Sequence, residues 1–168
     1  MSQPYEEIVE GERLLRFPPG ERHESICARL HAHLADSMGQ APSARLLAVR
    51  TLIEFSPSTR LCPDLAIVTA ASDKLWLVAE VISSDDHHAD TVDKKSFYES
   101  MKLPRLWMVD PRYDNVEVYH GTPYGMTLKH ILAGREVLSE PLLPGFQLGV
   151  HELFASTSGF ADSRQVDF

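Results

Sequence analysis

The sequence has few cysteines, few basic residues and no long apolar run, and each of these absences excludes a class of protein. Its 168 residues include only two cysteines, Cys27 and Cys62, so no disulfide framework is expected. No apolar stretch reaches the length of a membrane span, and no charged and apolar leader is recognisable. We therefore expect a cytoplasmic protein with no membrane partner.

The charge balance is acidic. There are 16 lysine and arginine residues against 24 aspartate and glutamate residues, and the formal net charge is -8. This balance argues against a protein that coats nucleic acid, because such proteins neutralise many phosphates with basic side chains. It is compatible with a nuclease, which needs an acidic metal site and only a local basic rim. The sequence contains neither a glycine-rich phosphate loop nor the serine, histidine and aspartate order of a hydrolase triad.

No repeat, linker or change of composition divides the chain. A chain of this length can bury about two thirds of the surface that it exposes when unfolded. We therefore predict a single domain over residues 1–155. The polar and small residues of 156–168 predict a disordered tail.

Apolar periodicity predicts alternating helices and strands. Residues 5–17 predict a hairpin that turns near Gly11. Residues 21–38 place apolar side chains at helical spacing, and alternation over 46–55 predicts a partly exposed strand. The other predicted elements are strands at 64–69, 75–83, 105–109 and 116–119, a helix at 90–101, short strands at 121–125, 126–132 and 136–138, and an apolar turn at 150–154.

Two carboxylates and a lysine are carried by consecutive predicted elements. Asp64 lies where a strand begins, Glu80 lies among apolar neighbours in the next strand, and Lys94 lies on the helix that follows. A carboxylate within an apolar strand costs free energy unless another group pairs with it. These residues are therefore candidates for one functional site, and the alternative is a turn aspartate and a glutamate held in a structural ion pair.

The order of these residues resembles the PD-(D/E)xK nuclease superfamily, and more narrowly the Uma-two-like family of bacterial restriction endonucleases. The resemblance rests on residues 62–68, 78–83, 106–111, 116–119 and 142–146, and on Asp90, Lys94 and Tyr98 at the family's spacing after Glu80. It implies an α/β (α+β) fold of the restriction-endonuclease type, with a mixed β-sheet flanked by helices. It also implies that Asp64, Glu80 and Lys94 are catalytic. We expect the strand residues Leu75, Leu77 and Val81 to be buried, as well as Trp107 or its neighbours Leu106 and Met108.

The resemblance also implies a metal site. Hard divalent ions such as Mg²⁺ bind carboxylate and carbonyl oxygens, so we expect Mg²⁺ or Mn²⁺ at Asp64, Glu80 and the carbonyl of Val81 or Ile82. Such an ion lowers the pKa of a bound water, and an ammonium such as Lys94 stabilises the charge that develops on the phosphate.

The sequence departs from the superfamily pattern at two places. The pattern puts a lysine two residues after the glutamate, where this chain has Ile82. The narrower family takes its lysine from the following helix, and its spacing favours Lys94 over Lys95. Residues 84–88 read Ser-Asp-Asp-His-His, where the family usually has a turn with basic residues. This adds negative charge beside the site and favours metal over phosphate.

Four further residues are candidate accessory groups: Glu7, His23, Asp90 and Tyr98. Glu7 matches a family glutamate, and His23 is either a helix cap or a neighbour of the site. Tyr98 lies one turn after Lys94 and serves either core packing or the site.

A zinc site from histidines is a weaker alternative. His31 and His33 point in different directions on a helix, because residues that share a helix face are three or four apart. His87 and His88 are expected to be solvated residues of a loop.

Two functions from different classes remain. The first is a Mg²⁺-dependent endonuclease that hydrolyses DNA phosphodiester bonds, as a possible homodimer because cutting a duplex takes two sites. The second is a non-catalytic regulatory or binding protein that keeps the nuclease fold. Binding of a metal ion distinguishes the two.

Overall fold

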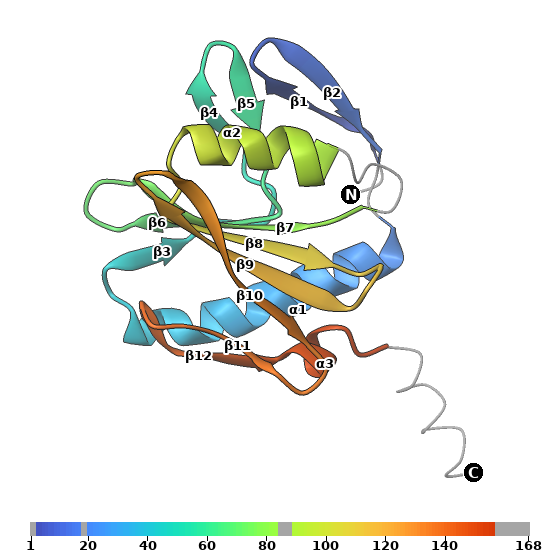
Figure 1. Cartoon of the computed structure of the whole chain (residues 1–168), viewed down its shortest axis with the longest axis vertical. Coiled ribbons are helices and arrows are strands. Elements are labelled where there is room, and N and C mark those ends of the chain that lie inside the picture. The colour runs from blue at the N-terminus through green and yellow to red at the C-terminus, as the bar shows by residue number, and fades with distance from the viewer. Residues whose placement is uncertain (1–2, 18–19, 84–88, 157–168) are drawn as a thin grey trace.

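The computed structural model describes residues 3–17, 20–83 and 89–156, which form a large mixed sheet, a small sheet and a hairpin, with helices on both sides of the large sheet (Figure 1). Residues 84–88 and 157–168, which include His87, His88 and nearly all of the predicted tail, lie outside these ranges. No helix in the described part of the chain is long and apolar enough to cross a membrane. The α/β (α+β) class predicted from the sequence is confirmed.

The large sheet has six strands in the order β10-β9-β8-β7-β6-β3. Their bounds are β3 Ala44–Leu46, β6 Leu65–Thr69, β7 Leu75–Val81, β8 Arg105–Asp110, β9 Asn115–Thr122 and β10 Gly125–Ala133. β7 and β8 are parallel, and the other neighbouring pairs are antiparallel. A parallel pair needs a crossover, and this one contains the π-helix η2 (Ala89–Lys94) followed by the α-helix α2 (Lys95–Ser100).

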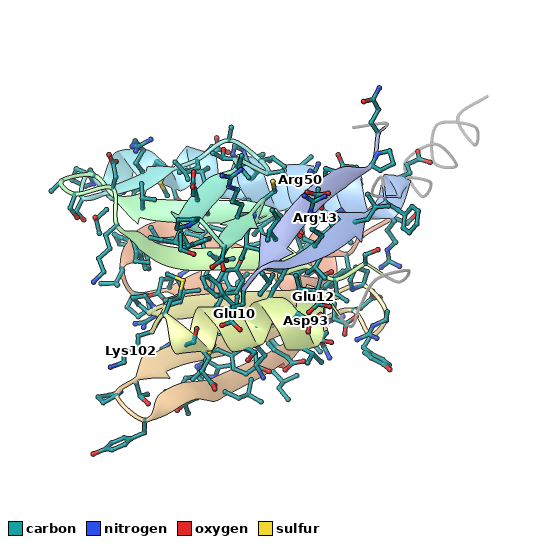
Figure 2. All side chains as sticks on the ribbon, turned by 90° about the horizontal axis from the view of Figure 1, so that it is seen from above. Glu10, Glu12, Arg13, Arg50, Asp93 and Lys102 are labelled. Atoms are coloured by element: carbon teal, nitrogen blue, oxygen red, sulfur yellow. The ribbon has the colours of Figure 1, made fainter. Side chains whose placement is uncertain are left out.

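The small sheet has four strands in the order β2-β1-β5-β4, with bounds β1 Tyr5–Val9, β2 Glu12–Arg16, β4 Ile53–Ser56 and β5 Thr59–Leu61. The predicted β1–β2 hairpin is confirmed. Its turn residues Glu10 and Gly11 both have positive φ, as a tight hairpin turn requires. Figure 2 shows this hairpin beside α2, with Glu10, Glu12 and Asp93 near their border. This border is therefore acidic.

One face of the large sheet is covered by α1 (Glu21–Ser37) and by a hairpin of β11 (Val137–Glu140) and β12 (Leu143–Gly149). A short 3-10 turn, η1 (Met38–Gln40), follows α1, and α3 (Val150–Leu153) follows β12. The apolar side chains of α1 recur at helical spacing, so they bury one continuous stripe. Trp107 of β8 is fully buried here and stacks on Phe146, with ring centroids 5.6 Å apart.

The opposite face of the sheet is covered by α2 and the small sheet (Figure 1). All seven residues of β7 are buried, which confirms the predicted burial of Leu75, Leu77 and Val81. Side chains two apart on a strand share a face. Val78 and Ile82 belong to the core under α2, so Glu80 between them points to α2 as well.

Three predicted elements are wrong in extent. The strand predicted at 46–55 is interrupted, because β3 ends at Leu46 and β4 begins at Ile53. Between them Arg50 has φ +55° and turns inward to an ion pair, so alternation does not reflect a continuous strand. The helix predicted at 90–101 is a π-helix for its first half. The short strand predicted at 121–125 is instead the end of β9 and the turn after it, whereas the strand predicted at 126–132 is confirmed as β10.

Candidate active site

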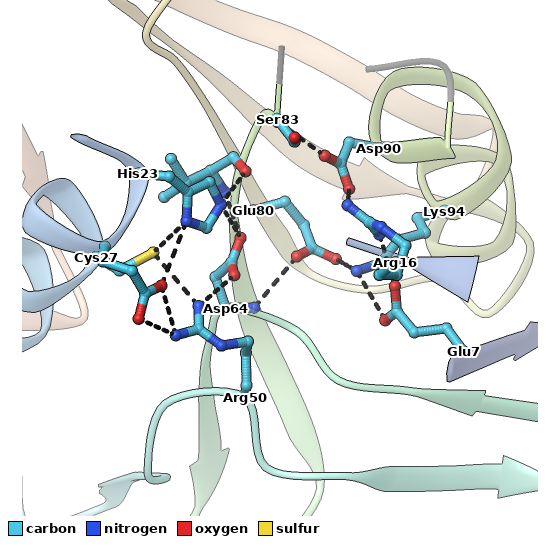
Figure 3. A network of polar contacts seen from close by, with 12 residues as sticks. Glu7, Arg16, His23, Cys27, Arg50, Asp64, Glu80, Ser83, Asp90 and Lys94 are labelled. Carbon is cyan, nitrogen blue, oxygen red and sulfur yellow. Dashed lines mark hydrogen bonds and ion pairs between the residues drawn. The ribbon is translucent and has the colours of Figure 1, made fainter. Parts of the chain in front are cut away.

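Buried charged residues gather where the start of β6 meets the end of β7 (Figure 3). Asp64 directly precedes β6, and Glu80 is the next-to-last residue of β7. Glu80 Oε1 accepts a hydrogen bond from the Asp64 N–H (3.2 Å), and Asp64 Oδ2 accepts one from the Val81 N–H (2.8 Å). The two predicted carboxylates therefore lie side by side, each bonded to the other's strand.

The first half of the site, called the Glu80 side, consists of Glu7, Arg16, Glu80, Asp90, Lys94 and Tyr98. Lys94 Nζ pairs with Glu80 Oε2 and lies 3.0 Å from Glu7 Oε2. The Tyr98 hydroxyl donates to Glu80 Oε2 at 2.9 Å. The side chains of Lys94, Glu80 and Glu7 are at most 1% exposed. Lys94 thus reaches Glu80 from the helix that follows β7, in the place expected from the sequence.

The Glu80 side continues through Arg16, which no motif in the sequence marks. Arg16 donates to Glu7 Oε1 at 2.6 Å and to Asp90 Oδ1 at 2.8 Å. Asp90 Oδ2 in turn accepts the Ser83 N–H at 3.1 Å. Asp90 and Lys94 are both buried on η2, so the π-helix directs a carboxylate and an ammonium into the same network. Such π segments are frequent at functional sites.

Burial and neighbouring charges shift the pKa values of Glu80 and Lys94 on the Glu80 side. Burial raises the pKa of Glu80 to about 7, against the lowering effect of Lys94 and with the help of Asp64 and Glu7. Burial lowers the pKa of Lys94, but the carboxylates of Glu80 and Glu7 outweigh it and raise the pKa well above its usual range. Lys94 therefore remains a cation.

The second half, called the Asp64 side, consists of His23, Glu24, Arg50 and Asp64. Arg50 Nη1 donates to Asp64 Oδ1 at 3.1 Å, and Arg50 Nη2 donates to Glu24 Oε2 at 2.7 Å. His23 Nε2 lies 2.8 Å from the carbonyl oxygen of Val81 and 3.5 Å from Asp64 Oδ2. Burial raises the pKa of Asp64, but the contacts with His23 and the Val81 N–H lower it to about 2. Asp64 is therefore ionised at neutral pH.

The Asp64 side borders a surface cavity of about 270 Å³. Its lining residues are Gly20, Arg22, His23, Ile82, Ser83, Pro111 and Arg112. His23 is the member of the Asp64 side that lines it, and its side chain is 11% exposed. Arg22 and Arg112, which pair with Asp114 and Asp110, bring basic groups to this opening. The opening is therefore more suited to a phosphate than the acidic border beside α2.

The donor atoms at this place fit a divalent ion. Asp64 offers an ionised carboxylate, and the Val81 carbonyl predicted as a ligand lies at the same point with the His23 imidazole beside it. Hard and borderline divalent ions bind such oxygen and nitrogen atoms. Glu80 Oε1 accepts a hydrogen bond from the Asp64 backbone, which places the Glu80 carboxyl close to these donor atoms. Its other oxygen, Oε2, is paired with Lys94.

The histidines His31 and His33 lie apart from the site, whereas the thiol of Cys27 borders it. Among the described residues, His31 and His33 belong to no cluster of three metal-ligating side chains. His31 Nε2 lies 3.1 Å from the Leu47 carbonyl oxygen. Cys27 Sγ lies 3.7 Å from His23 Nδ1 and 3.9 Å from Arg50 Nη1, and burial raises the pKa of this thiol. Cys27 is thus a buried neighbour of the site.

Comparisons with known proteins agree with this fold. Residues 2–151 match the model of the Uma2 family, described as "Putative restriction endonuclease". A solved structure from Anabaena variabilis ATCC 29413, described as "a putative nuclease belonging to DUF820", is similar with a TM-score of 0.73, at 15% identity and over 90% of both chains. No curated protein matches the chain. At this identity the solved structure shows a shared fold.

Proposed function

Because the chain belongs to the Uma2 family, we propose that it is a Mg²⁺- or Mn²⁺-dependent endonuclease that hydrolyses phosphodiester bonds of DNA. One observation supports this most. Two buried carboxylates from adjacent strands, Asp64 and Glu80, meet beside the Val81 carbonyl at the edge of a cavity with basic residues. In the proposal, Asp64, Glu80 and the Val81 carbonyl hold the metal.

Each part of the chain has a task in this proposal. The bound ion supplies a water of lowered pKa and positive charge for the phosphate oxygens. Arg50 and the Val81 N–H fix the Asp64 carboxylate so that one oxygen faces His23 and the Val81 carbonyl. Arg22 and Arg112 attract the phosphate to the cavity.

Lys94 is the proposed catalytic ammonium, and its contacts define what it does before substrate binds. Its Nζ contacts the carboxylates of Glu80 and Glu7 and is 1% exposed. In this arrangement the Lys94 ammonium only partly offsets the burial that raises the pKa of Glu80 to about 7. Contact with a phosphate requires Nζ to leave Glu7.

The proposal extends to the oligomeric state and the location of the protein. Cleavage of both strands of a duplex takes two sites, so we propose a homodimer that acts on DNA in the cytoplasm. The alternative is a non-catalytic binding protein with the nuclease fold. One observation favours that alternative, namely that Arg50 and Lys94 already compensate the Asp64 and Glu80 carboxylates.

The test is a cleavage assay with duplex DNA, single-stranded DNA and RNA, each with Mg²⁺, Mn²⁺ or Ca²⁺. Asp64→Asn and Glu80→Gln should abolish cleavage and weaken metal binding in calorimetry, with the fold checked by circular dichroism. Glu54→Gln is the matched control, since Glu54 lies exposed on β4. Cleavage by Asp64→Asn at the parent's rate would refute the assignment. Metal-independent DNA binding without cleavage would favour the alternative.

A further inference from the structure

The imidazole of His23 lies at the mouth of the candidate metal site, between the carbonyl of Val81 and the carboxylate of Asp64 (Figure 3). We infer that His23 Nε2 is itself a metal ligand, and that the site therefore prefers Mn²⁺ to Mg²⁺. This inference rests on the proposed function and deepens it by naming a third ligand and the class of ion.

The spacing of the donor atoms supports the inference. His23 Nε2–H donates a hydrogen bond to the Val81 carbonyl oxygen at 2.8 Å, and Nε2 lies 3.5 Å from Asp64 Oδ2. Neighbouring ligands of an octahedral ion with bonds of about 2.1 Å are separated by about 3 Å. The two separations from Nε2 bracket this value, so the nitrogen can share an ion with these oxygens once its proton has left. The remaining positions of such an ion belong to water, Glu80 and the substrate.

The other ring nitrogen lies near a carboxylate, the kind of group to which a metal-bound histidine often donates, and 3.7 Å from Cys27 Sγ. A ligating histidine commonly donates its second N–H to a carboxylate, which orients the ring. Nδ1 of His23 lies 3.5 Å from Glu24 Oε1. Arg50 pairs with both Glu24 and Asp64. One guanidinium therefore holds the proposed ligand Asp64 and also the Glu24 carboxylate that lies near His23.

Cys27 offers a rival ligand set with His23 and Asp64, since their donor atoms lie within 4.8 Å of one another. Arg50 opposes that set. Its Nη1 lies 3.9 Å from Cys27 Sγ and 3.1 Å from Asp64 Oδ1, so a positive charge already stands between the two. The Val81 carbonyl lies on the Nε2 side, and His23 lines the cavity that gives access to it. The Nε2 side is therefore the place for a cation.

The ligand set decides the metal preference. Mg²⁺ binds through oxygen atoms and keeps several waters, whereas imidazole suits transition ions. Because Mn²⁺ is a first-row transition ion, an imidazole in the ligand set should make it bind more tightly than Mg²⁺.

Calorimetric titration of the whole chain with Mn²⁺ and with Mg²⁺ measures this preference, and pulsed electron paramagnetic resonance of the Mn²⁺ complex detects a directly bound nitrogen. The parent should show ¹⁴N coupling and tighter Mn²⁺ binding. His23→Gln, which puts an amide at about the reach of Nε2, should lose the coupling and most of the preference. His33→Gln, on the same helix, is the matched control and should keep both.

These measurements distinguish failure of the His23 ligand assignment from failure of the proposed metal-dependent nuclease function. Mn²⁺ binding without ¹⁴N coupling, or coupling that survives in folded His23→Gln, overturns the ligand assignment and leaves a metal-dependent nuclease in place. Equal affinity for Mg²⁺ and Mn²⁺ overturns the preference. Failure of the parent to bind either ion overturns both the inference and the proposed metal dependence.

Discussion

The Glu80 side and the Asp64 side of the site share a hydrogen-bonded strand pair but differ in their access to solvent. On the Glu80 side, two cations and three carboxylates are closed off, and Lys94 is almost fully buried. On the Asp64 side, His23 borders a cavity and Glu24 is one third exposed. The difference indicates that the site opens to solvent on the Asp64 side, whereas Glu80 and Lys94 lie behind it in a closed network.

Removal of Lys94 should have the largest effect. Lys94→Ala leaves Glu80 and Glu7 buried without their shared cation, and breaking a buried pair in this way costs about 3–5 kcal/mol. Urea unfolding should show this loss. Where the variant remains folded, DNA cleavage should fall on the order of a hundredfold or more.

Lys95→Ala is the control for Lys94→Ala. Lys95 Nζ lies 4.4 Å from the centroid of the Tyr119 ring, a contact worth about 0.5–1 kcal/mol. Equal stability and equal activity of the two variants would show that the Glu80 side is not a closed network. The contrast with the solvent-accessible Asp64 side would then be contradicted.

A transplanted lysine tests whether the position or only the charge of Lys94 matters. Ile82 is buried on the same strand face as Glu80, two residues on. In the double variant Ile82→Lys, Lys94→Ala, an ammonium in this space should recover part of the hundredfold loss. Single-turnover cleavage at equal folded fraction measures it. No recovery in a folded double variant would show that the contact of Lys94 with Glu7 is indispensable.

Arg50→Ala tests the Asp64 side and should cost less than Lys94→Ala. Hydrogen bonds to charged groups are worth about 1.5–3 kcal/mol, and solvent from the cavity replaces part of what is lost. Urea unfolding gives the value. Arg45→Ala, which removes an exposed pair with Asp73, is the control and should cost at most about 1 kcal/mol. A larger loss for Arg50→Ala than for Lys94→Ala would reverse the roles of the two sides.

The sequence contained the residues of the Glu80 side that lie on consecutive elements. Glu80 in an apolar strand could be predicted because strand patterns are local, whereas Lys94 was selected over Lys95 by the spacing of the family that the sequence resembles. The hairpin turn at Gly11 and the buried β7 followed from the same kind of signal. Glu80 and Lys94 lie on β7 and on the crossover that directly follows it, so they are also close in the structure.

The residues that were missed, Arg16, Glu24 and Arg50, have partners far away along the chain. Arg16 lies 74 residues from its predicted partner Asp90, and Arg50 lies 26 residues from Glu24. Their pairing depends on how the small sheet and the loop after β3 pack against the large sheet, for which no local pattern exists. His23 was expected only as a cap or neighbour, because its place beside Val81 depends on the packing of α1 on β7.

Tyr98→Phe should have the smallest effect and decides between the two roles expected for Tyr98. Phenylalanine keeps the buried ring of the core under α2 and removes only the hydroxyl that donates to Glu80 Oε2. Lys94 still pairs with that oxygen, so the lost hydrogen bond should cost about 1 kcal/mol. Urea unfolding of the variant and the parent gives this number, and calorimetry with Mn²⁺ should show unchanged affinity. A loss of metal affinity in a fully folded variant would mean that the hydroxyl sets the position of Glu80 at the metal, and that Tyr98 serves the site as well as core packing.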